Sequence, residues 1–170
     1  MPHLEFPNIT HKDAYLEMVK EWGSAETIPT SPSKLFAGNS FEEFLELVES
    51  DIYDIEWRVP AHLFFLIDDI SSKILWAIQI RHHIDHPNLI EVGGHIGYGV
   101  RPTERGNWYA TEMLRLALLE AKKLGIEKVL LTCSDDNIAS AKVIENNGGK
   151  FERFTKKDGE KKRRYWITIL

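Results

Sequence analysis

Residues 97–111 read GYGVRPTERGNWYAT, and this stretch decides how the chain folds. Several glycines lie in the predicted strand 92–100, and glycine inside a strand marks a bulge or a close approach by a ligand or another backbone. A loop with Arg105 and Gly106 then opens onto an amphipathic helix that Gly125 ends. Free N–H groups and the dipole at a helix start attract anions, and an arginine adds a permanent cation. The pattern predicts an anion site, with a solvent-facing arginine as the plain alternative.

The same stretch resembles the acetyl-CoA motif of the GNAT family of N-acetyltransferases, which is Gln/Arg-x-x-Gly-x-Gly/Ala between a strand and a helix. Downstream, LLTC at 130–133, Asn137 with Ser140, and NNGG at 146–149 are similar to the second half of the family's core. The resemblance covers about residues 60–170, and the earlier residues by position only. It implies a GNAT-like acyl-CoA N-acyltransferase fold, with a central mixed β-sheet flanked by helices.

The resemblance also implies where acetyl-CoA binds. In the family, the strands that match 92–100 and 128–133 splay apart, and the pantetheine arm pairs with the backbone of the first strand. The diphosphate rests on N–H groups at the start of the following helix. The matching cofactor residues are Gly99, Val100, Arg105, Gly106, Asn107, Trp108, Tyr109, Ala110, Thr111, Asn137 and Ser140. Asn137 also fits a simple helix cap, and neither role excludes the other.

Position 108 departs from the family motif, because a tryptophan stands where the motif has glycine. Glycine serves there because a side chain could collide with the diphosphate or forbid the backbone conformation. Either Trp108 points outward while the loop keeps its path, or it blocks the cofactor. We expect a retained but altered site, because Arg105, Gly106 and Ala110 still match.

The catalytic groups implied by the resemblance are His95 and Glu91, which lie near the place where the family often has a base. His95 would titrate near neutrality, since an unperturbed imidazole has a pKa of about 6.5. The alternative is a histidine packed against a helix. Many family members have a tyrosine that acts as the general acid in the helix after the position of Asn137. The matching residue here is Ile144, so the role of general acid is not carried over.

The rest of the chain predicts an α+β domain. Helices are expected after Thr10 and after Ser40, where Glu43 completes a capping box, with a surface loop over 24–39 between them. A hairpin follows over 63–82. Beyond the motif helix come strand 128–133, a helix after Asn137, and two strands around Asp158-Gly159, and we expect the unit 92–133 to be parallel and right-handed. The order is α-α-β-β-β-α-β-α-β-β in one domain, 1–170.

Charge, cysteine count and apolar runs argue against several classes of function. Lys plus Arg is 21 and Asp plus Glu is 26, a net charge of −5, so nucleic acid is not the expected partner. One cysteine, Cys133, argues against a cysteine-based zinc site, and the histidines at 82–86 lack metal-ligand spacing. These patterns predict no metal site. No apolar run approaches the roughly 20 residues that span a bilayer. The start at Met1 lacks the pattern of a secretory signal, which predicts a cytoplasmic protein.

The function implied is direct transfer of an acetyl group from acetyl-CoA to a primary amine of a small molecule or peptide. The acceptor would enter across the N-terminal helices, within residues 1–59, and the loop 82–88. A non-catalytic CoA-binding or sensing module is the alternative, suggested by Trp108 and Ile144. The sequence leaves open whether the chain forms a homodimer.

Overall fold

The computed structural model describes residues 2–22, 40–53, 58–104, 106 and 108–169, with the backbone alone at Val100 and Pro102. The surface loop predicted over 24–39 lies outside these residues. The chain divides into two compact units, which are described separately. The first comprises Met1–Gln79 and Gly97–Asn107, and the second Ile80–Ile96 and Trp108–Leu170. The expectation of a single domain stays a prediction.

A four-stranded sheet forms most of the first unit, in the order β1-β2-β3-β4. Its strands are β1 (His3–Glu5), β2 (Ala61–Ile67), β3 (Ile74–Arg81) and β4 (Ile96–Val100). Strands β1 and β2 are antiparallel, from His3 opposite Ile67 to Glu5 opposite Phe65. The predicted β2–β3 hairpin is confirmed, and β1 was not predicted, because three residues are too few for a recognisable period.

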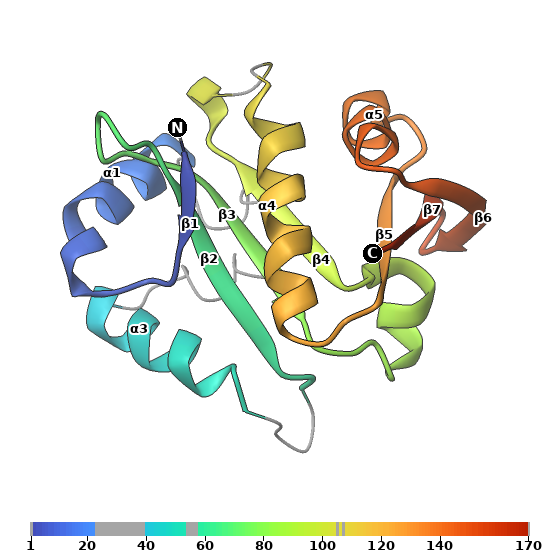
Figure 1. Cartoon of the computed structure of the whole chain (residues 1–170), viewed down its shortest axis with the longest axis horizontal. Helices are drawn as coiled ribbons and strands as arrows, with labels where there is room; N and C mark the ends of the chain where they lie inside the picture. Colours follow the sequence, from blue (N-terminus) through green and yellow to red (C-terminus); the bar gives the residue numbers. More distant parts are fainter. Residues whose placement is uncertain (1, 23–39, 54–57, 105, 107, 170) are drawn as a thin grey trace. The chain divides into compact units, whose positions relative to one another are not determined.

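Two helices cover the first unit's core. They are α1 (Lys12–Trp22) and α3 (Phe41–Ser50), in blue and cyan in Figure 1. The predicted capping box starts α3: the Ser40 hydroxyl accepts from the Glu43 N–H at 3.2 Å, and the Glu43 carboxylate accepts from the Ser40 N–H at 2.8 Å. Alternate β2 residues pack with aromatic side chains of both helices, among them Tyr15, Phe41, Phe44, Leu63, Phe65 and Ile67.

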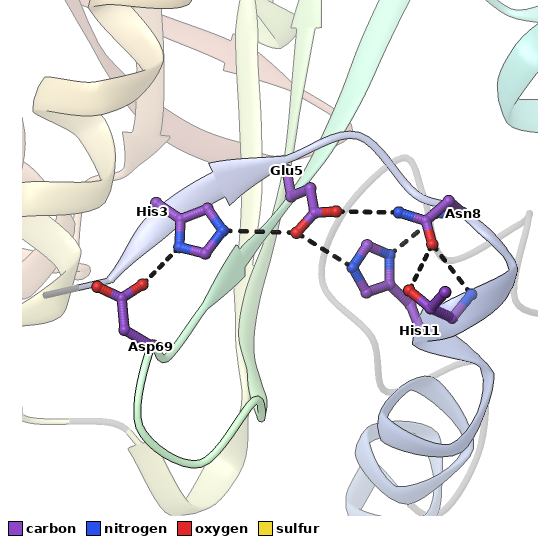
Figure 2. Close-up of polar contacts among 6 residues, drawn as sticks. His3, Glu5, Asn8, His11 and Asp69 are labelled. Carbon is purple, nitrogen blue, oxygen red and sulfur yellow. Dashed lines mark hydrogen bonds and ion pairs between the residues drawn. The ribbon is translucent and has the colours of Figure 1, made fainter.

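Histidines and carboxylates fasten the N-terminal strand, as Figure 2 shows. His3 Nδ1 lies 2.6 Å from an Asp69 oxygen, in the β2–β3 turn. One Glu5 oxygen lies 3.4 Å from His3 Nε2 and 3.5 Å from His11 Nε2, and Asn8 donates to the other at 3.0 Å. Partial burial opposes ionisation of Glu5, but the His11 charge and these hydrogen bonds together lower its pKa.

A three-stranded antiparallel sheet, in the order β5-β7-β6, lies in the second unit. Its strands are β5 (Lys128–Ser134), β6 (Lys150–Lys157) and β7 (Glu160–Thr168). The predicted turn joins β6 to β7, with Asp158 at φ 51° and Gly159 at φ 84°. A register shift lies between Phe151 and Arg153.

The second unit also holds the two helices predicted around β5. Helix α4 (Tyr109–Lys123) ends before Gly125, which has φ 77°, and α5 (Ile138–Asn146) ends before Gly148, at φ 84°. The Asn147 amide joins them by donating to the Thr111 carbonyl at 3.1 Å. These boundaries agree with the prediction.

The predicted strand 92–100 is wrong over its first half. Residues Leu89–Gly93 form a turn of π-helix, η3, and β4 starts only at Ile96. The reason lies at Gly94, whose φ of 67° is incompatible with a strand and whose N–H donates to the Leu89 carbonyl at 2.7 Å. Gly93 and His95 therefore do not lie on a strand.

Strands β4 and β5 belong to different sheets, and the ladders of the described residues do not pair them. The resemblance implies that these two strands splay apart, so no ladder between them was expected, and the parallel, right-handed unit 92–133 stays a prediction. The helices and antiparallel strands still make an α+β chain, as predicted.

Candidate functional site

Strand β4 is the outermost strand of its sheet and contains Gly99 and Val100, two of the predicted cofactor residues. An outer strand presents N–H and C=O groups that its own sheet does not pair, which is where an extended amide-bearing ligand can add as a strand. A single 3₁₀ turn, η4 (Pro102–Glu104), follows it. The β4 backbone therefore has the form that the pantetheine prediction requires.

Arg101 anchors the exit from β4, a role that the sequence analysis did not identify. Its side chain is 1% exposed and lies 3.0 Å from a Glu17 oxygen and 2.5 Å from a Glu21 oxygen, both on α1. It also donates to the Ile74 carbonyl at 3.2 Å, and Thr103 donates to Glu21 at 2.9 Å. The hydrogen bond from Arg101 lowers the pKa of Glu21. These contacts position the backbone that leads to the motif loop.

Gly106 occupies the left-handed region, at φ 83°, and a Cβ added there would meet nothing within 4 Å. The predicted residues Arg105 and Asn107 lie outside the described part of the chain. Only glycine adopts this conformation at little cost, and its open surroundings leave the backbone approachable. Gly106 thus meets the requirement for a loop that lets an anion reach main-chain N–H groups.

Helix α4 begins at Tyr109 without a side-chain cap, because its N-cap is Trp108 and makes no capping hydrogen bond. The Trp108 indole is 61% exposed, and its ring centroid lies 4.8 Å from that of Tyr109. Trp108 has φ −61°, an ordinary helical value. Position 108 therefore does not need the conformational freedom of glycine, and the side chain is exposed, while the expectation that the site is retained stays a prediction.

Asn137 and Ser140 lie together at the start of α5. The side-chain amide oxygen of Asn137, Oδ1, accepts from the Ser140 N–H at 3.0 Å, so the predicted cap is confirmed. The Asn137 side chain is exposed. Ile144 lies deeper in the same helix with 1% exposure, and as a buried hydrocarbon it cannot donate a proton.

His95 is buried rather than open to a cleft, with 7% exposure. The imidazole Nδ1 accepts from the Leu130 N–H at 3.0 Å, and the main-chain N–H of His95 donates to the Leu130 carbonyl at 2.8 Å. Burial, helped by the Arg81 charge, lowers the pKa of His95 to about 4. The expectation of titration near neutrality is therefore wrong, while the role as base stays a prediction.

Glu91 lies on η3 and contacts strand β6 of the three-stranded sheet. Arg153 donates to both of its oxygens at 2.9 Å, and Thr155 donates at 3.1 Å. The Arg153 hydrogen bond lowers the pKa of Glu91. A carboxylate held in this way is a weaker proton acceptor than a free one, and its predicted role as base is untested.

The described ranges also bear on metal binding and on membrane spans. They contain no group of three or more His, Cys, Asp and Glu side chains suited to a metal ion. None of the helices they include is long and apolar enough to cross a membrane.

A family model described as "Acetyltransferase (GNAT) domain" matches residues 6–150. The chain belongs to the GNAT family. The match includes both N-terminal helices. The motifs that carry the resemblance lie outside these helices, which were assigned to the family only from their place in the order of elements. Family membership confirms the resemblance that the motif showed and the predicted enzyme class, an N-acetyltransferase. Among curated proteins, the sequence has no match.

Solved structures share the fold. The ribosomal L7/L12 alpha-N-protein acetyltransferase RimL, in complex with coenzyme A, is 17% identical, with a TM-score of 0.69 and coverage of 98% of this chain and 93% of RimL. The spermidine/spermine N-acetyltransferase SpeG from Vibrio cholerae is 15% identical, with TM-score 0.66 and coverage of 99% and 95%. The yncA protein from Salmonella typhimurium, with acetyl-CoA, is 10% identical, with TM-score 0.65 and coverage of 99% and 94%. These likenesses confirm the GNAT fold.

Proposed function

We propose that this GNAT domain transfers the acetyl group of acetyl-CoA to a primary amine of a small molecule or peptide. Acetyl-CoA supplies a thioester, an activated acyl donor that an unprotonated amine attacks directly. Family membership supports this donor, and the similar yncA and RimL structures hold acetyl-CoA and coenzyme A respectively. The donor is also the one that the motif resemblance implies.

The residues around the loop fit the cofactor. Main-chain N–H groups from Gly106 to Ala110 would hold the diphosphate, because Gly106 leaves space and α4 begins without a side-chain cap. The backbone at Gly99 and Val100 would pair with the pantetheine arm. Arg105, Asn107, Trp108, Tyr109 and Thr111 are further predicted contacts at the loop and helix start, and Asn137 and Ser140 at α5. The observation that carries the proposal is the left-handed, unobstructed Gly106 directly before an uncapped helix in the family motif.

The proposed acceptor is cationic. The similar structures include SpeG, a spermidine/spermine N-acetyltransferase, and RimL, which acts on a ribosomal protein. Helix α3 carries four glutamates, at 42, 43, 46 and 49, and no Lys or Arg, and such a surface attracts protonated amines. We propose that the N-terminal region 1–59 contributes to the acceptor site and that a single domain, 1–170, carries the activity.

Two measurements on the full chain test the proposal. Acetyl-CoA and CoA should each raise the unfolding midpoint, since a ligand at about 100 times its Kd adds about 2.7 kcal/mol of stability. Thiol release is then followed with a polyamine, an α-amino peptide and a neutral amine, and acetylation of the acceptor is checked by mass spectrometry. Release that depends on an amine supports transfer. Binding without any transfer would favour the sensing module, and no binding would contradict both.

A further inference from the structure

The segment before β4 is bonded on two sides. The Arg81 N–H, at the end of β3, donates to the His95 carbonyl at 2.8 Å, and the Arg81 guanidinium donates to the Gly94 carbonyl at 2.9 Å. On the other side, His95 exchanges two hydrogen bonds with Leu130 of β5, one through its backbone N–H and one through its imidazole. Residues 94 and 95 therefore connect the last residue of β3 to the middle of β5.

The imidazole of His95 accepts a hydrogen bond that a backbone carbonyl would accept in a regular sheet. In a continuing parallel ladder, a main-chain oxygen would accept from the Leu130 N–H. Here His95 Nδ1 accepts instead, and Leu130 is fully buried. A buried N–H without an acceptor is costly, so this position needs a side-chain acceptor of this reach. The hydrogen bond also fixes the tautomer, with the ring proton on Nε2.

Gly94 permits the close approach. Its φ is 67°, and an added Cβ would lie 2.5 Å from the Leu130 carbonyl oxygen. No other residue fits this contact without displacing the β5 backbone. Gly94 and His95 together form a clamp, which we call the His95 clamp, on Leu130.

We propose that His95 is a positioning residue, whose Nδ1 holds the Leu130 N–H and thereby fixes residues 94 and 95, the segment that leads into β4, to β5. The inference rests on the proposed function, because β4 is the strand expected to carry the cofactor arm. It assigns to His95 a role other than the base predicted from the sequence. In the positioning role Nδ1 accepts from the Leu130 N–H and Nε2 carries the ring proton, so neither ring nitrogen has a free lone pair with which to take a proton from the amine.

The surroundings keep the ring in the form that the clamp needs. Burial lowers the pKa of His95 most, and the positive charge of Arg81 lowers it further; of the neighbouring groups, Asp85 raises this pKa and His83 lowers it. The Trp166 ring, on β7, lies edge-on with its centroid at 6.4 Å. At neutral pH the imidazole is therefore uncharged, and Nδ1 keeps its lone pair.

Three substitutions separate positioning from base catalysis. In His95→Asn the amide oxygen takes the place of Nδ1, in His95→Gln it takes the place of Nε2, and His95→Ala has neither. Positioning predicts that the Asn variant keeps kcat and the KM for acetyl-CoA within about threefold, with an unmoved acidic limb of the pH–rate profile. The Gln and Ala variants should raise that KM at least tenfold. Equal losses in all three variants, with loss of the acidic limb, would show a base and overturn the proposal.

A measurement without substrate keeps the inference separate from the proposed function. Nitrogen-15 NMR of the unliganded wild-type chain at pH 7 should show the His95 proton on Nε2 and slow hydrogen exchange of the Leu130 amide. Exchange of that amide should stay slow in His95→Asn and become at least tenfold faster in His95→Ala. A proton on Nδ1, or unchanged exchange in His95→Ala, would overturn the clamp. Failure of acetyl-CoA to bind would instead contradict the proposed function while leaving this result standing.

Discussion

The position that needs glycine in this motif is 106 rather than 108. Trp108 has a helical φ of −61° and an exposed indole, whereas Gly106 has φ 83° with open space where a Cβ would lie. The sequence indicates a loop that needs a glycine, but the family motif places the need for a left-handed φ at position 108, where this chain has tryptophan. The sequence could not do better, because backbone dihedral angles of a loop depend on how both ends are held. Arg101, which holds one end, gave no signal in the sequence.

Gly106→Ala should weaken CoA binding at least tenfold, because the new methyl group would occupy the space through which we expect the diphosphate to approach. Isothermal titration with CoA measures this. Gly125→Ala is the matched control, since Gly125 also has φ 77° with nothing within 4 Å of an added Cβ. Both variants carry a similar backbone strain of about 1 kcal/mol. Equal CoA affinities in the two would mean that Gly106 is not at the diphosphate site.

Trp108→Gly should tighten CoA binding roughly threefold to tenfold, because it removes an indole beside the proposed amide donors and leaves glycine, a good N-cap residue. The same titration tests it, with Trp108→Phe expected to stay close to the wild type. Unchanged or weaker binding in the glycine variant would show that the tryptophan is accommodated or contributes to the site.

Among the helices, strands and turns, those fixed by interactions within a few residues were predicted correctly, and one that depends on residues far away in the sequence was not. The α3 capping box, the glycines that end α4 and α5, and the Asp158-Gly159 turn each act within a few residues, and each appears where expected. The η3 turn was missed because its conformation depends on the distant strand β5. Thr132 donates to the Val92 carbonyl at 2.6 Å, and Arg164 donates to the Ile90 carbonyl. A sequence window around 92–100 contains none of these partners.

Arg101 is expected to hold the β4 exit to α1. Arg101→Met should cost about 2 kcal/mol of unfolding free energy, since charge-assisted hydrogen bonds to two glutamates are lost while their partly exposed carboxylates regain water. Urea denaturation measures the change. Arg115→Met is the control, because Arg115 makes an equally close pair with Glu112 on the surface and should cost under about 0.5 kcal/mol. Similar losses in both variants would contradict the anchoring role.

For the molecule as a whole, the sequence predicted the fold class, the family and, through the resemblance, the separation of the two middle strands, but not the residue at which β4 begins. The motif at 97–111 and the order of elements were sufficient for the family, which the match over 6–150 confirms. Which strands share a sheet depends on contacts such as the His95 clamp, between residues far apart in the sequence. The catalytic base and the acceptor need substrate geometry, which no pattern of residues in this chain encodes.

Stability should fall as the pH is lowered from about 6.5 to about 4. In this range an unfolded histidine binds a proton, whereas folded His95, with a pKa of about 4, does not. The unfolded state therefore binds more protons, and acid favours it. The lowered pKa of Glu5 adds a loss only below its ordinary value of 4.5. Unfolding midpoints across this range should fall in the wild type and change less in His95→Asn; identical profiles would contradict the assignment.

The central claim is that main-chain N–H groups at the start of α4 bind the diphosphate of acetyl-CoA. A crystal structure of the chain with CoA tests it most directly. We predict diphosphate oxygens within hydrogen-bond distance of N–H groups between Gly106 and Ala110, with the pantetheine arm along β4. Diphosphate density elsewhere on the molecule, or an indole of Trp108 turned into that place with no CoA bound, would contradict the claim.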